Sequence, residues 1–239
     1  VHDVTTAEAS LTLRYAPGES FVNSKQRRIP VSLDAPIFTL THAMGFKGVL
    51  GGEYSFNRTE ASVWKRFWLP SSWGKIDCSI KAGAEWNTVP FPLLILPEAN
   101  LSYITQRETF NLINNMEFLN DRFASVSLSY DMNGKLFNRI PLIKNLKWRE
   151  MFRVRALWGT LTDKNNPFKS SNPDLFRFPM RDGKFTSFVM DPKIPYVEAS
   201  VGIYNIFKLL HIEYVHRFTY RDNPGINKNG VRFMVLMAF

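Results

Sequence analysis

The feature of this sequence that most constrains its fold is a strict alternation of apolar and polar residues. The stretch KIDCSIKAGAEW, residues 75–86, alternates without exception. A period of two is the period of a β-strand, in which successive side chains point to opposite faces of a sheet. The apolar set of this stretch is Ile76, Cys78, Ile80, Ala82, Ala84 and Trp86. The alternation therefore predicts a strand with one apolar and one polar face.

Similar segments recur along the whole chain. They are residues 8–16, 36–45, 54–69, 122–132, 151–159, 196–205, 209–221 and 231–239. The sequence thus predicts an all-β, antiparallel protein with about nine strands. Many of these segments reach ten residues or more, whereas strands of globular proteins average roughly five or six. A tilted transmembrane strand needs roughly nine to eleven residues, so strand length favours a transmembrane β-barrel.

The polar faces of the predicted strands carry many charges. The candidate set is Asp77, Glu85, Asp131, Arg153, Arg155, Glu198, Glu213 and Arg217. In a membrane barrel this face is the lumen, and these residues would form a lumen charge network. In a soluble β-sandwich the same face would be the wet exterior. The acidic residues of this set could pair with lumen arginines, but structural ion pairing explains them equally well.

Three further features favour the barrel. Aromatic residues close the apolar faces at Tyr15, Trp86, Tyr130, Trp158 and Tyr220, as expected of interfacial girdles. The connections 69–74 and 204–208 are tight, whereas 87–120, 162–195 and 221–229 are long. Outer-membrane barrels have this asymmetry of short turns and long loops. One connection departs from it, because residues 134–147 belong at the short end and yet are long.

The last segment, GVRFMVLMAF, is a candidate assembly signal. Hydrophobic residues at every second position end in a terminal phenylalanine: Val231, Phe233, Val235, Met237 and Phe239. This pattern resembles the C-terminal signal of bacterial outer-membrane barrels, which the assembly machinery recognises. The alternative is a buried last strand of a soluble domain. If the segment is the signal, deletion of Phe239 is expected to lower the amount of protein in the membrane.

The sequence offers little for catalysis or cofactor binding. It has a single cysteine, Cys78, no Gly-x-Ser-x-Gly elbow and no calcium-loop spacing. His211 and Glu213 share one strand face, and Ser127 and Ser129 lie on the polar face of another. We expect no enzyme activity, no metal and no cofactor. The net charge of +9 is dispersed, which does not favour a nucleic acid. It suits the binding of anionic lipid headgroups and the solubility of long loops equally well.

Long motifs carry a resemblance to a known family. The segments VPFPLLILPEANLSYITQRETFNLINNMEFLNDRFASVSLSYDMNGKLFNRIPLIKNLKWREMF, WGTLTDKNNP and PYVEASVGIYNIFKLLHIEYVHRFTYRDNP resemble the C-terminal half of a Bacteroidota family of uncharacterised outer-membrane proteins. Members of that family join a carboxypeptidase-regulatory-like β-sandwich to a barrel. More distantly, the barrel is similar to the BamA/TpsB surface-antigen superfamily, which inserts or translocates proteins.

The resemblance implies that residues 1–239 are one unit, the C-terminal portion of a barrel of about 16 strands. It places residues 87–120 where the superfamily has a long lumen-entering loop. The Val-Arg-Gly-Phe/Tyr motif of that loop is missing, and the nearby Arg107 and Arg122 stand in other contexts. The resemblance therefore does not imply insertase or translocase activity for this chain.

We accordingly expect a protein of the bacterial outer membrane that acts in envelope biogenesis or in protein or ligand passage. Its expected partners are the lipid bilayer, lipopolysaccharide, the assembly machinery and other envelope proteins, with no nucleic acid. A soluble or surface β-sandwich for binding remains the alternative, and a passive porin is a third.

Overall fold

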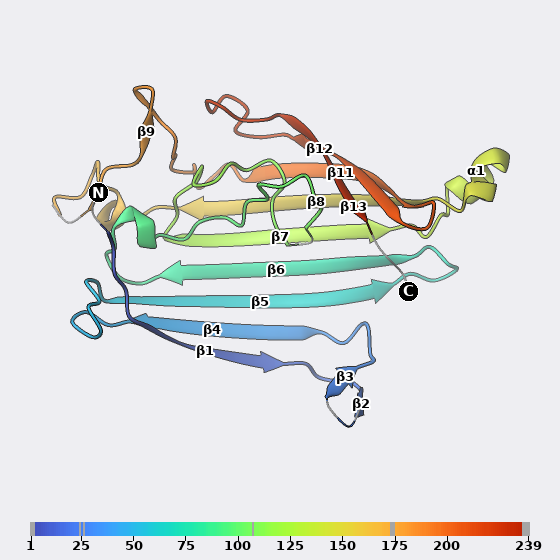
Figure 1. Cartoon of the computed structure of the whole chain (residues 1–239), viewed down its shortest axis with the longest axis horizontal. Helices are drawn as coiled ribbons and strands as arrows, with labels where there is room; N and C mark the ends of the chain where they lie inside the picture. Colours follow the sequence, from blue (N-terminus) through green and yellow to red (C-terminus); the bar gives the residue numbers. More distant parts are fainter. Residues whose placement is uncertain (1–2, 24, 26, 107, 173–174, 236–239) are drawn as a thin grey trace.

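The computed structural model describes residues 3–23, 25, 27–106, 108–172 and 175–235. Nine long strands form one antiparallel sheet in the order β1-β4-β5-β6-β7-β8-β11-β12-β13 (Figure 1). The strands are β1 (Glu8–Tyr15), β4 (Ile37–Gly45), β5 (Phe56–Trp68), β6 (Lys75–Glu85), β7 (Arg122–Asp131), β8 (Arg149–Thr160), β11 (Tyr196–Ile206), β12 (Leu210–Arg217) and β13 (Asn229–Val235). Each of the nine predicted segments overlaps one of these strands, so the all-β antiparallel prediction is confirmed.

The two faces of the sheet differ in the way the alternation predicts. On β8 the outward-facing Val154 is 46% exposed, and Phe152 and Trp158 beside it are also exposed. The inward-facing Arg153 and Arg155 are buried, with only 2% of Arg155 exposed. A soluble protein normally buries its apolar side chains and exposes its charges. This sheet does the reverse, with an exposed apolar outer face and a charged inner face.

The end of β12 differs from the prediction. The alternation continues through Phe218 and Tyr220, but the strand stops at Arg217. The Arg217 guanidinium donates to the carbonyl oxygens of Thr219 (3.0 Å) and Tyr220 (2.7 Å), which turns the chain. The Tyr220 ring then packs on Phe118, with ring centroids 5.1 Å apart, and burial raises the pKa of its hydroxyl. Tyr220 is therefore part of an internal cluster and not of an aromatic girdle.

The sheet is open in the described part of the chain. β1 and β13 are its two edges, and neither pairs with the other. β13 pairs antiparallel with β12, as expected, from Leu210 opposite Val235 to His216 opposite Asn229. On its other side, the Phe233 N–H donates to the Tyr103 carbonyl oxygen (2.9 Å) and the Phe233 carbonyl oxygen accepts from the Thr105 N–H (2.8 Å). These nine strands thus do not close into a barrel by themselves, and the larger barrel stays a prediction.

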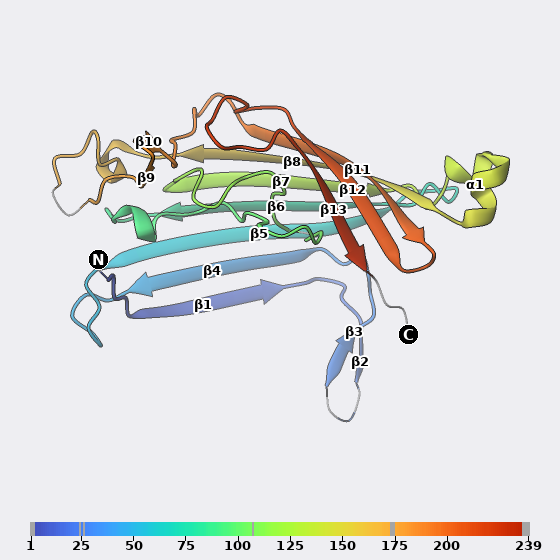
Figure 2. The same ribbon diagram turned by 45° about the horizontal axis from the view of Figure 1, so that its top comes forward.

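The connections define two rims of the sheet. The turn rim consists of residues 16–36, 69–74, 132–148 and 207–209, and the loop rim of residues 46–55, 86–121, 161–195 and 218–228. The turn rim contains two long connections as well as two tight ones. The first holds an unanticipated hairpin of β2 (Phe21–Asn23) and β3 (Arg28–Pro30), which projects from the sheet (Figure 2). The second holds the 3-10 turn η2 (Phe137–Arg139) and the helix α1 (Pro141–Leu146).

The long connections of the loop rim cover part of the inner face. They include η1 (Phe91–Leu93), η3 (Asp163–Asn165) and a small hairpin of β9 (Met180–Arg181) and β10 (Lys184–Phe185). Figure 1 shows the connection between β6 and β7 lying over the sheet, and its Glu98, Gln106, Asn111 and Glu117 contact β6, β8, β11 and β12 in turn. Two buried apolar clusters form beneath these connections, one around Phe56 and Leu119 and one around Phe118 and Tyr196. Among the described residues, no helix combines the length and apolar character needed to cross a membrane.

The tight turn between β5 and β6 provides a test of the packing at the turn rim. Gly74 has φ of +89°, and a Cβ there would lie 1.8 Å from the Asp131 carbonyl oxygen. Gly48 has a similar φ of +82°, but a Cβ there would meet no atom within 4 Å. We expect Gly48→Ala to cost about 1–2 kcal/mol of unfolding free energy through backbone strain alone. Gly74→Ala should cost roughly 3 kcal/mol or more, because the backbone of β7 must also move. Urea unfolding followed by tryptophan fluorescence compares the two, and equal midpoints would contradict this packing.

Candidate functional site

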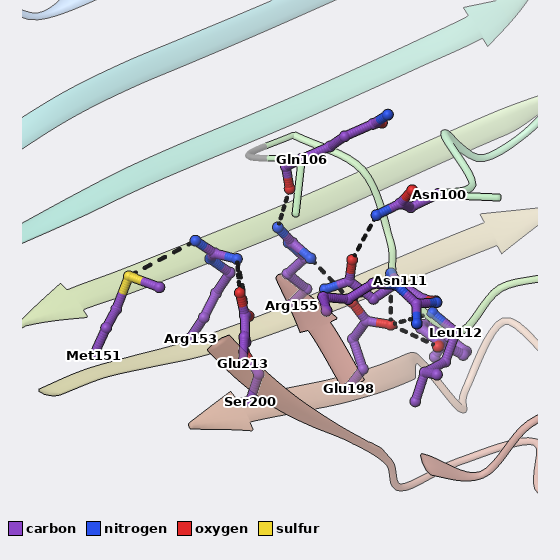
Figure 3. Close-up of polar contacts among 12 residues, drawn as sticks. Asn100, Gln106, Asn111, Leu112, Met151, Arg153, Arg155, Glu198, Ser200 and Glu213 are labelled. Atoms are coloured by element: carbon purple, nitrogen blue, oxygen red, sulfur yellow. Dashed lines mark hydrogen bonds and ion pairs between the residues drawn. The ribbon is translucent and has the colours of Figure 1, made fainter. Parts of the chain in front are cut away.

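The predicted lumen charges lie at inward-facing positions of β6, β7, β8, β11 and β12. They are buried or half-buried, and each is paired with a side chain of opposite charge. The structure brings Arg153, Arg155, Glu198 and Glu213 together in one cluster on neighbouring strands (Figure 3). The other four form separate pairs. The structure places these charges on the inner face as one cluster and four separate pairs, not as one continuous network, and their role in a lumen stays a prediction.

The first half of the cluster connects β8, β11 and β12. The Arg153 guanidinium donates to both carboxylate oxygens of Glu213, each at 2.9 Å. The same carboxylate accepts from the Ser200 hydroxyl and lies 3.3 Å from His211 Nε2. Ser200 thus donates to the carboxylate and not to the imidazole. In a site that activates a serine nucleophile, the hydroxyl donates to the imidazole and the carboxylate orients the imidazole. The expectation of no enzyme activity stays a prediction.

The second half of the cluster binds the long connection 86–121 of the loop rim. Glu198 pairs with Arg155 at 3.1 Å and also accepts from the backbone N–H groups of Asn111 (2.9 Å) and Leu112 (3.0 Å). Arg155 donates in turn to the Gln106 carbonyl oxygen at 3.0 Å (Figure 3). A buried carboxylate that accepts several backbone N–H groups fixes their positions strongly. The wall of the sheet therefore holds this connection through charge-assisted hydrogen bonds.

A second anchor joins the same connection to β12. The Arg217 guanidinium donates to both oxygens of Glu117, at 3.0 and 2.6 Å, and both side chains are buried. Arg217 also donates to the Leu112 carbonyl oxygen at 3.1 Å and lies over the ring of Tyr196 at 4.8 Å. The Asn223 side-chain amide adds a bond of 2.8 Å to Glu117. This bidentate pair ties three parts of the chain together at the loop rim.

The remaining predicted charges lie on the other side of the inner face. Asp77 pairs with Arg66 at 2.6 Å, and Glu85 with Arg58 at 3.6 Å. Asp131 accepts from the Tyr204 hydroxyl at 2.6 Å and lies 3.6 Å from Lys75. A cavity of about 350 Å³ lies between the Arg66–Asp77 pair, the Lys75–Asp131 pair and Arg153, and its wall includes the serines at positions 79, 125, 127 and 129.

Sequence reasoning missed several partners. Arg58 and Arg66 lie in the predicted strand 54–69, two and ten residues after Phe56 on the same face, so the alternation could have found them. Glu117 lies in an irregular connection, where no periodic signal reports which way a side chain points.

The candidate assembly signal is described only in part. Val231, Phe233 and Val235 are exposed on the outer face of β13, as predicted for lipid-facing residues. Met237 and Phe239 lie outside the described residues. The role of this segment in assembly stays a prediction.

Comparison with known proteins supports the fold. The BamA structure from Haemophilus ducreyi lacking POTRA domains 1–3 is similar to this chain with a TM-score of 0.54 and 11% sequence identity. The similarity covers 96% of this chain but only 42% of the BamA chain. At this identity the likeness concerns the fold alone. A comparison with curated proteins gives no match.

A family model gives a more specific result. The model described as "Family of unknown function (DUF5686) C-terminal domain" matches residues 2–168, which is more than half of the chain. The expected Bacteroidota origin and the expected carboxypeptidase-regulatory-like domain remain predictions. The matched range includes β1 to β8 and the anchored connection 86–121. The chain therefore belongs to the family of unknown function DUF5686, as a representative of its C-terminal domain.

Proposed function

We propose that this chain is the C-terminal portion of a transmembrane β-barrel of the bacterial outer membrane. The observation that carries the proposal is the inverted sheet, with exposed apolar side chains outside and buried ion pairs inside. Lipid solvates the first face favourably, whereas water does not. In the membrane the polar inner face needs either water or protein against it, and the anchored connection 86–121 supplies part of that protein.

The direction of the edge strands supports a larger barrel. Nine strands joined in simple antiparallel order leave β1 and β13 running in the same direction. Closure by antiparallel pairing thus needs an odd number of further strands. Seven would give the 16 strands of our expectation. If a second copy were inserted in the same orientation, its β1 would run parallel to β13 of the first copy. Dimerisation therefore does not provide an antiparallel closure.

The covered inner face favours a gated or scaffolding role over a passive porin. Apolar clusters and two buried charge anchors hold the loop-rim connections against the sheet. A water-filled porin leaves its lumen open. We therefore propose a role in envelope biogenesis or in protein or ligand passage, with lipid, lipopolysaccharide and assembly factors as partners.

The soluble β-sandwich alternative requires a second sheet packed on the apolar face. In the described ranges, the small two-stranded hairpins are the only sheets besides the nine-stranded one. Ile80 on that face is exposed, and Cys78 beside it is half-buried. This arrangement favours contact with lipid over contact with a second sheet.

Fractionation of cells that produce the full-length protein tests the proposal. We expect the protein to stay in the membrane fraction after alkaline extraction and to enter solution only with detergent. A lipid-soluble maleimide should label Cys78 in membranes, whereas a charged, water-soluble maleimide should not. Release without detergent, or protection of Cys78 from both reagents until unfolding, would contradict the proposal.

A further inference from the structure

The connection 132–148 is an exception to the barrel pattern. It lies at the turn rim between β7 and β8, although the neighbouring turns 69–74 and 207–209 are tight. Figure 1 shows its helix α1 extending beyond the end of the sheet. The ion-pair anchors described above do not involve this connection, so its length needs another explanation.

The connection has a defined position on the rim. Lys135 donates to the Ser71 carbonyl oxygen at 2.9 Å, and its ammonium lies 5.0 Å from the centroid of the Trp73 ring. At the other end, the Asn205 side-chain amide donates to the Lys147 carbonyl oxygen at 2.7 Å. The turn 69–74 and the end of β11 therefore hold the connection, which makes it a fixed projection of the rim.

This projection is both apolar and basic. Leu136, Ile140, Leu142 and Leu146 are exposed, and Leu142 is 83% exposed. The connection also contains Lys135, Arg139, Lys144 and Lys147 and has no acidic residue. Exposed leucines interleaved with lysine and arginine are the pattern of segments that lie in a membrane interface.

The net charge of the molecule is also distributed unevenly between the two rims. The turn-rim connections carry eight Lys and Arg against two Asp and Glu, whereas the loop-rim connections carry ten against ten. Most of the net charge of +9 is therefore concentrated at the turn rim. Lys and Arg near an anionic membrane surface each contribute about 1 kcal/mol of attraction, and the attraction falls off within a Debye length.

We propose that the connection 132–148 is an interfacial anchor that inserts its leucines beside the barrel and binds anionic phospholipid headgroups. This inference rests on the proposed membrane barrel and identifies the partner of its turn rim. Short turns face the periplasmic side of outer-membrane barrels, where the leaflet is made of phospholipid. The rim also continues directly into the apolar outer face of β7 and β8, which exposes Leu128 and Phe152.

Three fluorophore positions in the full-length protein test the anchor. The native Cys78 reports on the outer face, Leu142→Cys on the anchor and Leu50→Cys on the loop rim, with Cys78→Ala in the latter two. Leu50 is a matched control because it is 91% exposed and lies at the opposite rim. Each protein is labelled with an environment-sensitive dye and reconstituted in phosphatidylcholine vesicles with or without phosphatidylglycerol. Spin-labelled lipids then quench any dye that lies in the bilayer.

We expect quenching at Cys78 in both lipid mixtures, none at Leu50→Cys, and quenching at Leu142→Cys that increases with phosphatidylglycerol. The triple variant Arg139→Gln, Lys144→Gln and Lys147→Gln should abolish that increase. The triple variant Lys47→Gln, Lys169→Gln and Lys193→Gln at the loop rim, built from exposed lysines, should leave it unchanged.

The outcomes separate the anchor from the barrel. No quenching at Cys78 would contradict the proposed membrane barrel itself. Quenching at Cys78 with none at Leu142→Cys would overturn the anchor and leave the barrel standing. Quenching at Leu142→Cys that is equally strong with and without phosphatidylglycerol would also overturn the anchor, because the anionic headgroup would then not contribute to binding. Protection of Leu142→Cys from aqueous iodide without lipid quenching would indicate a protein partner and contradict the anchor.

Discussion

Replacing Glu117 with alanine is expected to reduce the free energy of unfolding by about 3–5 kcal/mol. Glu117 has only 2% of its side chain exposed and receives two hydrogen bonds from Arg217, whose side chain is fully buried. Its removal leaves the guanidinium in the interior without that carboxylate. The backbone N–H of Asn114 and the amide of Asn223 lose their acceptor as well. Urea unfolding in detergent measures the loss.

Glu108→Ala is the matched control for this variant. Glu108 lies in the same connection, but its side chain is 74% exposed and its pair with Lys81 is long at 3.6 Å. Such an exposed pair contributes at most about 1 kcal/mol. Limited proteolysis should also cut near residues 106–117 faster in Glu117→Ala than in Glu108→Ala. Similar stability and similar cleavage of the two variants would contradict the role of Glu117 as an anchor.

Placing an arginine on the outer face should also reduce stability strongly when that face is in lipid. Leu40 is an exposed residue near the middle of β4, and its neighbours Leu13 and Ala61 also point outward. In lipid, Leu40→Arg is expected to cost about 2–4 kcal/mol and to lower the amount of folded protein in the membrane. In a soluble sheet the same exposed position would change stability by only about 0.5 kcal/mol. Unfolding in phospholipid vesicles measures the difference.

Thr41→Arg controls for this substitution on the same strand. Thr41 points to the inner face, and Glu60 lies directly opposite on β5. An arginine there acquires an acidic neighbour and stays out of the lipid, so we expect little loss of stability. If Leu40→Arg is tolerated as well as Thr41→Arg, the outer face is not in contact with lipid.

Periodicity made much of the sheet predictable from the sequence. The outward position of Ile80 and the inward position of Lys81 follow from the alternation, because neighbouring residues of a strand must face opposite ways. The same rule found Arg153, Arg155, Glu198 and Glu213, and the strand register then brought them together. Tyr220 was misplaced because the alternation continues after the strand has ended.

The irregular parts were beyond this kind of reasoning. The hairpin β2–β3 has strands of only three residues, which is too short for a period to be recognised. Glu117 reaches Arg217 across a hundred positions of sequence, and its position depends on the path of an irregular connection.

We propose that one face of this sheet contacts lipid and that the other contacts water or protein. Single spin labels placed along β6, from Lys75 to Glu85, test this in reconstituted vesicles. Cys78 is replaced in every variant that carries its label at another position. We predict that collision with oxygen peaks at Ile76, Cys78 and Ile80. Collision with a water-soluble nickel complex should be lowest at these positions, so that the two profiles alternate out of phase with a period of two. Uniformly low oxygen collision at the even-numbered positions would mean that protein covers this face, and the account would be wrong.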